Sequence, residues 1–271
     1  KVGGTVWGEI AKERITFNEE TLWTGGPGTS ASYKGGNNDS KGRNGATLRE
    51  LNQKLEQGAQ TVNPSNLTGG ENAAEQGSYQ NWGNIYIDYG LGTQPAENYE
   101  RSLNLSEGKA NVSFRSGQVD YKREFWVSNP DNVMVVRLTA SQAKALNLKV
   151  TFPTNSGFTK KGETTTVTGD TLTVKGALGN NGLLYNVKIK AVVEGAEGSV
   201  SSDDGKALKI SDAGAVTLYI AAGTNYQNTY PSYRNGEDAK ALDTRLAANV
   251  QKAANKGYAQ VKKDHIADHQ S

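Results

Sequence analysis

Residues 120–138 read DYKREFWVSNPDNVMVVRL, and this stretch decides the fold class. Two runs, 120–127 and 133–138, flank the pentapeptide SNPDN, whose asparagine, proline and aspartate are typical of turns. Both runs have the period-two character of strands, in which successive side chains point to opposite faces of a sheet. The stretch therefore predicts two short strands joined by a tight turn.

The same pattern recurs from about residue 84 onward, and glycine, asparagine, aspartate or serine interrupts it at short intervals. The other predicted strands are 84–89, 111–114, 146–152, 171–174, 184–193 and 215–220. Many short alternating strands at this spacing are typical of antiparallel sheets packed face to face. No repeat at a solenoid or propeller period is visible. We predict an all-β fold, a large antiparallel β-sandwich.

Two segments break the strand pattern. Residues 46–57 place three leucines on one helical stripe and stop at Gly58, which predicts a short helix inserted among loops. Apolar residues then recur at helical spacing from 239 to 253, and a second helical piece follows Gly257. We predict a β-sandwich domain over residues 1–230 and a helical linker over residues 231–271.

Composition excludes several functional classes. The 271 residues include 30 Lys plus Arg and 28 Asp plus Glu, a formal charge of +2 with both signs interspersed. This balance predicts neither a nucleic-acid partner nor a membrane partner, and no apolar run is long enough to span a bilayer. Cysteine is absent, which excludes disulfides, thiolate metal sites and cysteine nucleophiles. The richness in Gly, Asn, Ser and Thr suits a secreted bacterial β-protein, and 29–45 and 58–79 are predicted long loops.

Glu19 and Glu20 are adjacent carboxylates in the segment FNEETLWTGGPG, residues 17–28. Neighbouring residues of an extended chain point to opposite faces, so this pair cannot easily share one substrate atom. A glycosidase acid and base face each other across the bond, usually from different segments. We therefore predict that one carboxylate accepts a hydrogen bond and the other faces solvent. Gly25 and Gly26 are explained by a tight turn rather than by a phosphate loop.

His265 and His269 stand at i and i+4 on the second predicted helix, a spacing that zinc sites use. The catalytic motif carries Glu after the first histidine, where this chain has Ile266, and the sequence has no third histidine. A structural or interdomain role is favoured over a metal. We predict no metal at this pair.

Four tryptophans could stack on sugar rings, although strands bury most aromatic residues. Trp23 and Trp82 lie beside loop signals and are the predicted surface candidates. Trp126 lies in a clear strand and is predicted to be core.

The segment GTVWGEIAKERITFNEETLWTGGP at residues 4–27 resembles the opening of the glycoside hydrolase family 95 enzymes, the α-L-fucosidases. Further segments follow in the family's order. They are YQNWGNIYI at 79–87, YERSLNL at 99–105, REFWVSNPDNVMVVRLTA at 123–140, AAGTNY at 221–226 and DHIADHQ at 264–270. Departures are Asn81-Trp82 in place of Pro-Leu and Asn104 in place of Asp.

The resemblance covers essentially the whole chain and implies a super-β-sandwich of the galactose mutarotase-like kind, a helical linker and then an (α/α)6 barrel. The implied activity is hydrolysis of terminal α-1,2-linked L-fucose, or of α-L-galactose, with inversion and without a cofactor. The family's catalytic Glu and Asp belong to the barrel, past Ser271, so the resemblance places no catalytic residue in this chain. The implied partners are that barrel and a fucosylated oligosaccharide or glycan, and the implied location is extracellular or cell-surface.

The resemblance also suggests a role for the first motif. A sandwich loop can reach toward the barrel's pocket, and Asn18, Glu19 and residues 23–27 are the predicted contact, with Trp82 as a further candidate. Two alternatives remain open from the residues alone. They are an independent carbohydrate-binding module and a structural adhesin-like β-domain.

Overall fold

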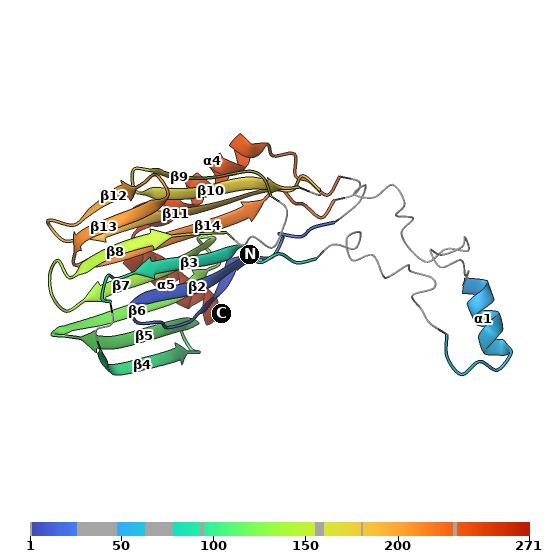
Figure 1. Ribbon diagram of the computed structural model, residues 1–271, viewed down its shortest axis with the longest axis horizontal. Coiled ribbons are helices and arrows are strands. Elements are labelled where there is room, and N and C mark those ends of the chain that lie inside the picture. The colour runs from blue at the N-terminus through green and yellow to red at the C-terminus, as the bar shows by residue number, and fades with distance from the viewer. Residues whose placement is uncertain are drawn as a thin grey trace. The chain divides into compact units, whose positions relative to one another are not determined.

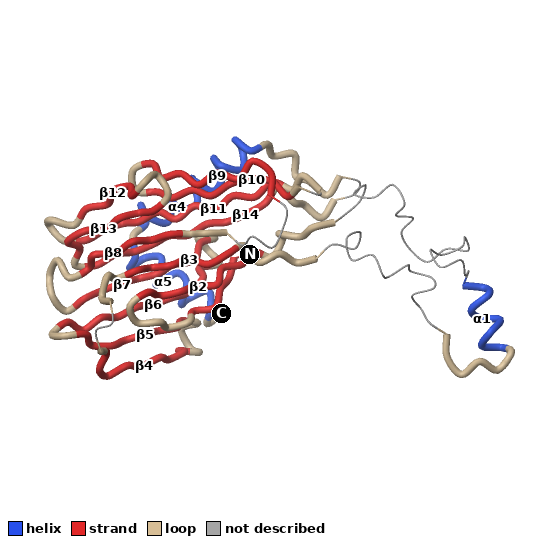
Figure 2. Tube along the Cα trace, viewed as in Figure 1, coloured by secondary structure: helices blue, strands red, loops and turns tan. Residues whose placement is uncertain are grey.

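The computed structural model of the chain describes residues 2–25, 48–62, 78–92, 95–154, 160–179, 181–229 and 232–271. The chain divides into two compact units, one formed by residues 1–22 and 81–271 and the other by residues 23–80. All strands of the described residues belong to the first unit, and strands make up most of it (Figure 2).

Two antiparallel sheets form the larger unit (Figure 1). The six-stranded sheet has the order β1 (Val2–Val6), β2 (Lys12–Glu19), β3 (Gly83–Asp88), β8 (Leu146–Thr151), β13 (Ala207–Ala213) and β12 (Ser199–Asp203). The eight-stranded sheet has the order β4 (Ala96–Asn104), β5 (Lys109–Ser116), β6 (Val119–Ser128), β7 (Val133–Ala140), β14 (Ala215–Thr224), β11 (Leu184–Glu194), β10 (Thr171–Leu178) and β9 (Lys160–Thr168). The predicted β-sandwich is confirmed, and each predicted run coincides with one of these strands.

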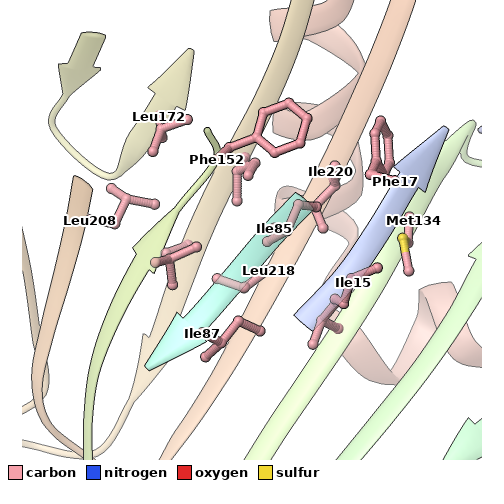
Figure 3. Close-up of a cluster of buried hydrophobic side chains, with 14 of the residues drawn as sticks. Ile15, Phe17, Ile85, Ile87, Met134, Phe152, Leu172, Leu208, Leu218 and Ile220 are labelled. Carbon is pink, nitrogen blue, oxygen red and sulfur yellow. The ribbon is translucent and has the colours of Figure 1, made fainter. Parts of the chain in front are cut away.

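Side-chain alternation explains the core between the sheets. In β2, Ile15 and Phe17 are fully buried while Arg14 and Thr16 between them are only partly buried. Figure 3 shows how buried side chains from the two sheets meet, with Phe17 of β2 near Ile220 of β14 and Ile15 of β2 near Met134 of β7. Burying one face of each strand removes a large apolar area from water, which is the main stabilising term for such a fold.

Two helices pack on the outer face of the eight-stranded sheet. Helix α4 (Ala239–Lys256) contacts β11 and β14, and helix α5 (Tyr258–His269) contacts β6. The apolar stripe predicted for α4 is buried against Trp126 and Tyr219 of the sheet. Asp238 caps α4 by accepting the N–H of Ala241 at 2.7 Å, and Gly257, with φ of 82°, ends it.

The unit of residues 23–80 contains one described helix, α1 (Leu48–Glu56), which confirms the inserted helix over those residues. Leu51 is buried in it and Leu55 is exposed. The predicted loop at 29–45 lies outside the described residues, and the loop at 58–79 is described only at 58–62 and 78–79. No helix in the described ranges has both the length and the apolar character needed to cross a membrane.

Candidate functional site

The end of β2 holds the carboxylate that the sequence singles out. Glu19 continues the inward alternation of Ile15 and Phe17, and its side chain lies at the end of the core with 4 % of the residue exposed. Its Oε2 accepts the hydroxyl of Thr21 at 2.6 Å and the backbone N–H of Thr21 at 3.0 Å. Glu20 is exposed. The prediction that the two carboxylates differ, one hydrogen-bonded and the other on the surface, is therefore confirmed.

A hydrogen-bond chain connects Glu19 to the end of β14. The hydroxyl of Thr21 lies 2.5 Å from the hydroxyl of Thr224, which accepts the N–H of Tyr226 at 3.1 Å. The carbonyl of Thr224 accepts from the guanidinium of Arg245 on α4 at 3.1 Å. These hydrogen bonds hold the residues that follow β2 and β14 together at one end of the sandwich. Tyr226, 38 % exposed, is the surface residue of this site that the sequence analysis missed.

Trp82 is a correction to the sequence analysis. It was predicted to be a surface residue, but only 1 % of it is exposed, because its ring packs edge-on against Phe17 at 6.3 Å and Tyr185 at 5.7 Å. Its indole N–H donates to the carbonyl of Glu19 at 3.3 Å. The prediction was wrong because it was based on the neighbouring loop residues. Trp82 directly precedes β3, and its side chain fills the end of the core. It cannot stack on a ligand, but it does hold Glu19.

Two other candidates from the sequence, Asn18 and Trp23, belong to different compact units. Asn18 lies on the opposite side of β2 from Glu19, and its buried Oδ1 has no hydrogen-bond partner. Trp23 belongs to the unit of residues 23–80, where it forms an antiparallel bridge with Tyr79. Their rings lie 5.5 Å apart, and both residues are exposed by more than two fifths.

The turn predicted at Gly25 has the conformation that favours glycine, with φ of 75°. Gly26 and the rest of that turn lie outside the described residues. Within the larger unit, the described sequence candidates Glu19 and Trp82 are in direct contact.

The two histidines hold α5 against the turn between β4 and β5. The Nε2 of His265 donates to the carbonyl of Glu107, and the Nε2 of His269 donates to the carbonyl of Leu105, each at 2.8 Å. His265 also stacks on Trp126 at 6.1 Å. Among the described residues, no cluster of three potential ligands could hold a metal. The structural role predicted for the histidines is confirmed.

A charged cluster under α5 joins the helix to the sheet. Glu124 of β6 accepts from Lys109 at 2.6 Å, from Tyr258 at 2.6 Å and from Lys262 at 3.2 Å. Burial alone would raise the pKa of Glu124, but the three hydrogen bonds outweigh burial and lower this pKa to about 2. The ionised carboxylate is therefore the form that stabilises the docking of α5.

Replacing Glu124 with glutamine should destabilise the chain at neutral pH by on the order of 2 kcal/mol, because the charge that three donors share is lost. The native pKa lies below the ordinary value of 4.5, so the contribution of Glu124 is complete above pH 4.5 and is lost as pH falls toward 2. Urea unfolding of wild type and Glu124→Gln across this pH range measures the difference.

The difference in the free energy of unfolding between wild type and Glu124→Gln should decrease steadily below pH 4.5. Glu100→Gln, which removes an exposed carboxylate from β4, is the matched control and should leave stability nearly unchanged. If the stability difference between wild type and Glu124→Gln stays constant from pH 7 to pH 2, the charge of Glu124 does not stabilise the fold.

The architecture defines the class of protein. A solved structure described as "Putative kojibiose phosphorylase from human microbiome" has a similar fold, with a TM-score of 0.51 and 10 % identity, over 71 % of this chain and 28 % of that chain. At this identity the likeness concerns the fold alone. The chain is thus a two-sheet β-sandwich domain of a kind that also occurs as a minor part of a much longer chain.

Residues 1–229 match the family described as glycosyl hydrolase family 65, N-terminal domain, and the chain belongs to this family. It is also 30 % identical to "Probable alpha-fucosidase A" of Aspergillus niger over 278 residues, and 27 % identical to "Alpha-L-fucosidase 2" of Arabidopsis thaliana over 291 residues. Both alignments include 100 % of this chain and 33 % of the relative. The resemblance to α-fucosidases is confirmed, and the chain spans about a third of the length of these relatives.

Proposed function

We propose that this chain is the non-catalytic N-terminal domain of an exported α-L-fucosidase of glycoside hydrolase family 95. The parent enzyme would remove terminal α-1,2-linked L-fucose, or α-L-galactose, from oligosaccharides with inversion. One observation carries the proposal: α-fucosidases align with the whole chain, yet the chain supplies only a third of their length. The remaining two thirds leave room for a separate catalytic domain.

The most buried carboxylates support a non-catalytic role. Glu19 is held by Thr21, and Glu13, fully buried, forms an ion pair with Arg123 at 2.7 Å. An inverting glycosidase instead needs two carboxyl groups, about 6.5 to 9.5 Å apart, that face each other across a substrate pocket. We therefore assign the general acid and the general base to the part of the parent protein outside this chain.

The site at the end of β2 suggests how the domain contributes. Thr21 and Thr224 bring two loops together, and Tyr226 stands exposed beside them. A loop end fixed by hydrogen bonds can present a rigid surface to a neighbouring domain, and rigid support keeps a pocket in its working geometry. We propose that this end contacts the catalytic barrel and supports the rim of the fucose pocket.

The full-length parent protein should release L-fucose from an α-1,2-fucosylated oligosaccharide, while the 271-residue chain alone should release none. Proton NMR of the first product formed distinguishes the β-anomer, expected for inversion, from the α-anomer.

Glu19→Gln in the full-length enzyme should lower kcat/KM several-fold, because the neutral amide is a weaker acceptor for both donors of Thr21.

Glu20→Gln is the matched control, since it changes the neighbouring exposed carboxylate, and it should retain wild-type kcat/KM. Fucose release by the isolated chain would contradict the non-catalytic assignment, and a full-length protein without fucosidase activity would contradict the proposed activity. Wild-type kinetics in Glu19→Gln would show that the end of β2 does not support the pocket.

A further inference from the structure

A polar cavity lies between α4 and the β9–β10 edge of the eight-stranded sheet. Its volume is about 400 Å³. Helix α4 contacts β11 and lies behind this part of the sheet in Figure 1. The floor comes from β9, β10 and β11, and the wall comes from α4 through residues that include Asp243 and Gln251. Neither the sequence motifs nor the proposed fucosidase role accounts for this cavity.

Strand register explains why the floor is uniformly polar. Three rows cross β9, β10 and β11, and the pairings within each row are set by the antiparallel ladders. The rows are Thr164–Lys175–Asn186, Thr166–Thr173–Lys188 and Thr168–Thr171–Lys190. Every side chain in this grid can donate a hydrogen bond, and none is apolar. The grid therefore suits a ligand rich in acceptor oxygens.

The charges on this floor are not balanced. Lys190 is paired with Asp170 at 2.6 Å. Lys188 and Lys175 share one carboxylate, that of Asp243, at 2.9 Å and 3.9 Å. Two ammonium groups facing one carboxylate leave an excess positive charge, and a second anion would compensate it.

Burial restricts what can reach this charge. Lys188 is 6 % exposed and Thr173 is 8 % exposed, because both lie on the floor beside the wall formed by α4. A broad protein surface cannot reach so deep a floor, whereas a single sugar ring with an acidic substituent can. A neighbouring cavity of about 300 Å³ also includes Lys175, and Gly176 and Leu184 line it. The two cavities together can hold adjacent rings of one saccharide.

We propose that this groove binds an anionic saccharide through a carboxylate or sulfate group that contacts Lys175, Lys188 and the hydroxyl of Thr173. The adjoining ring lies beside Gly176 and Leu184. This site is separate from the loop end at Glu19 and involves no chemical step. It would attach the domain to acidic glycans, independently of whether the parent enzyme hydrolyses fucose.

Isothermal titration of the 271-residue chain with a trigalacturonate, a 6-sulfated galactotriose and neutral galactotriose tests the proposal. At least one acidic trisaccharide should bind, and it should bind at least tenfold more tightly than the neutral one. Lys175→Ala should weaken this binding about tenfold, because one charge-assisted hydrogen bond is lost. Lys188→Gln should weaken it at least as much. The acidic probe that binds better identifies the group recognised.

Lys175 is about half exposed, so its replacement leaves the buried core unchanged. Thermal melting of both variants tests whether they remain folded. Lys149→Ala, which removes an exposed lysine from β8, is the matched control and should bind as wild type does. Absence of acidic binding, equal binding of the neutral sugar, or unchanged binding by Lys175→Ala would overturn the proposal. Inorganic sulfate that binds as tightly as the acidic sugars would also overturn it, as an adventitious ion only.

Discussion

Replacing Arg123 with methionine should lower the free energy of unfolding by about 3 to 5 kcal/mol, because it leaves the carboxylate of Glu13 buried without its counter-charge. Both side chains are fully buried, and their closest atoms lie 2.7 Å apart. The pair connects β6 of the larger sheet to β2 of the smaller one. Its removal should therefore weaken the contact between the sheets.

The partners of this ion pair explain why both charges tolerate burial. The guanidinium of Arg123 donates to the carbonyls of Glu9 and Ile10, each at 2.5 Å. The carboxylate of Glu13 accepts the N–H of Gly8 at 2.8 Å. The guanidinium also lies 4.2 Å from the centre of the Tyr89 ring, a cation–π contact. The ion pair thus satisfies backbone groups of the loop between β1 and β2.

Urea unfolding of the 271-residue chain measures the effect. Arg115→Met is the matched control, because Arg115 on neighbouring β5 forms an ion pair with Asp120 in which both side chains are nearly half exposed. That variant should unfold close to the wild-type midpoint. The double variant Glu13→Leu/Arg123→Met should recover only part of the loss, since the loop's backbone groups lose their partners. A wild-type midpoint for Arg123→Met would refute the structural role of the pair.

Replacing Trp82 with alanine should cost about 3 to 5 kcal/mol, the range measured when large buried aromatic residues are truncated. The indole fills the end of the core against Phe17 and Tyr185, and its loss leaves a cavity there. The substitution also removes the donor to the carbonyl of Glu19. Trp82→Phe should fall between wild type and Trp82→Ala, because it keeps most of the ring volume but not the N–H.

Trp23→Ala is the matched control, since it truncates the same residue type where about half of it is exposed. Its effect on the unfolding of the sandwich should be within about 0.5 kcal/mol. Thermal and urea unfolding of the three variants give the comparison. Equal losses for Trp82→Ala and Trp23→Ala would show that burial does not distinguish these two tryptophans.

Four of the strands that the sequence analysis did not predict lie at sheet edges, β4 and β9 in the larger sheet and β1 and β12 in the smaller one. The other two, β2 and β13, lie inside the smaller sheet and were missed although each has a buried face. Nearly all residues of β4 are exposed on both faces, so no apolar alternation marks it. β9 is rich in threonine and has no buried residue. Period-two patterning reports the burial of one face, and a strand without a buried face lacks that signal.

The sequence by itself determined the elements whose pattern is local. Helical spacing predicted α4 and α5, and the opposite orientation of neighbouring residues in an extended chain distinguished Glu19 from Glu20. Alternation predicted eight of the strands, namely β3, β5, β6, β7, β8, β10, β11 and β14. Tertiary structure alone decided which distant segments meet. The contacts of Glu13 with Arg123, of Thr21 with Thr224 and of Lys175 with Asp243 depend on strand order and helix docking. A periodic pattern specifies which face of an element is buried, but the partner on that face depends on the arrangement of the whole chain.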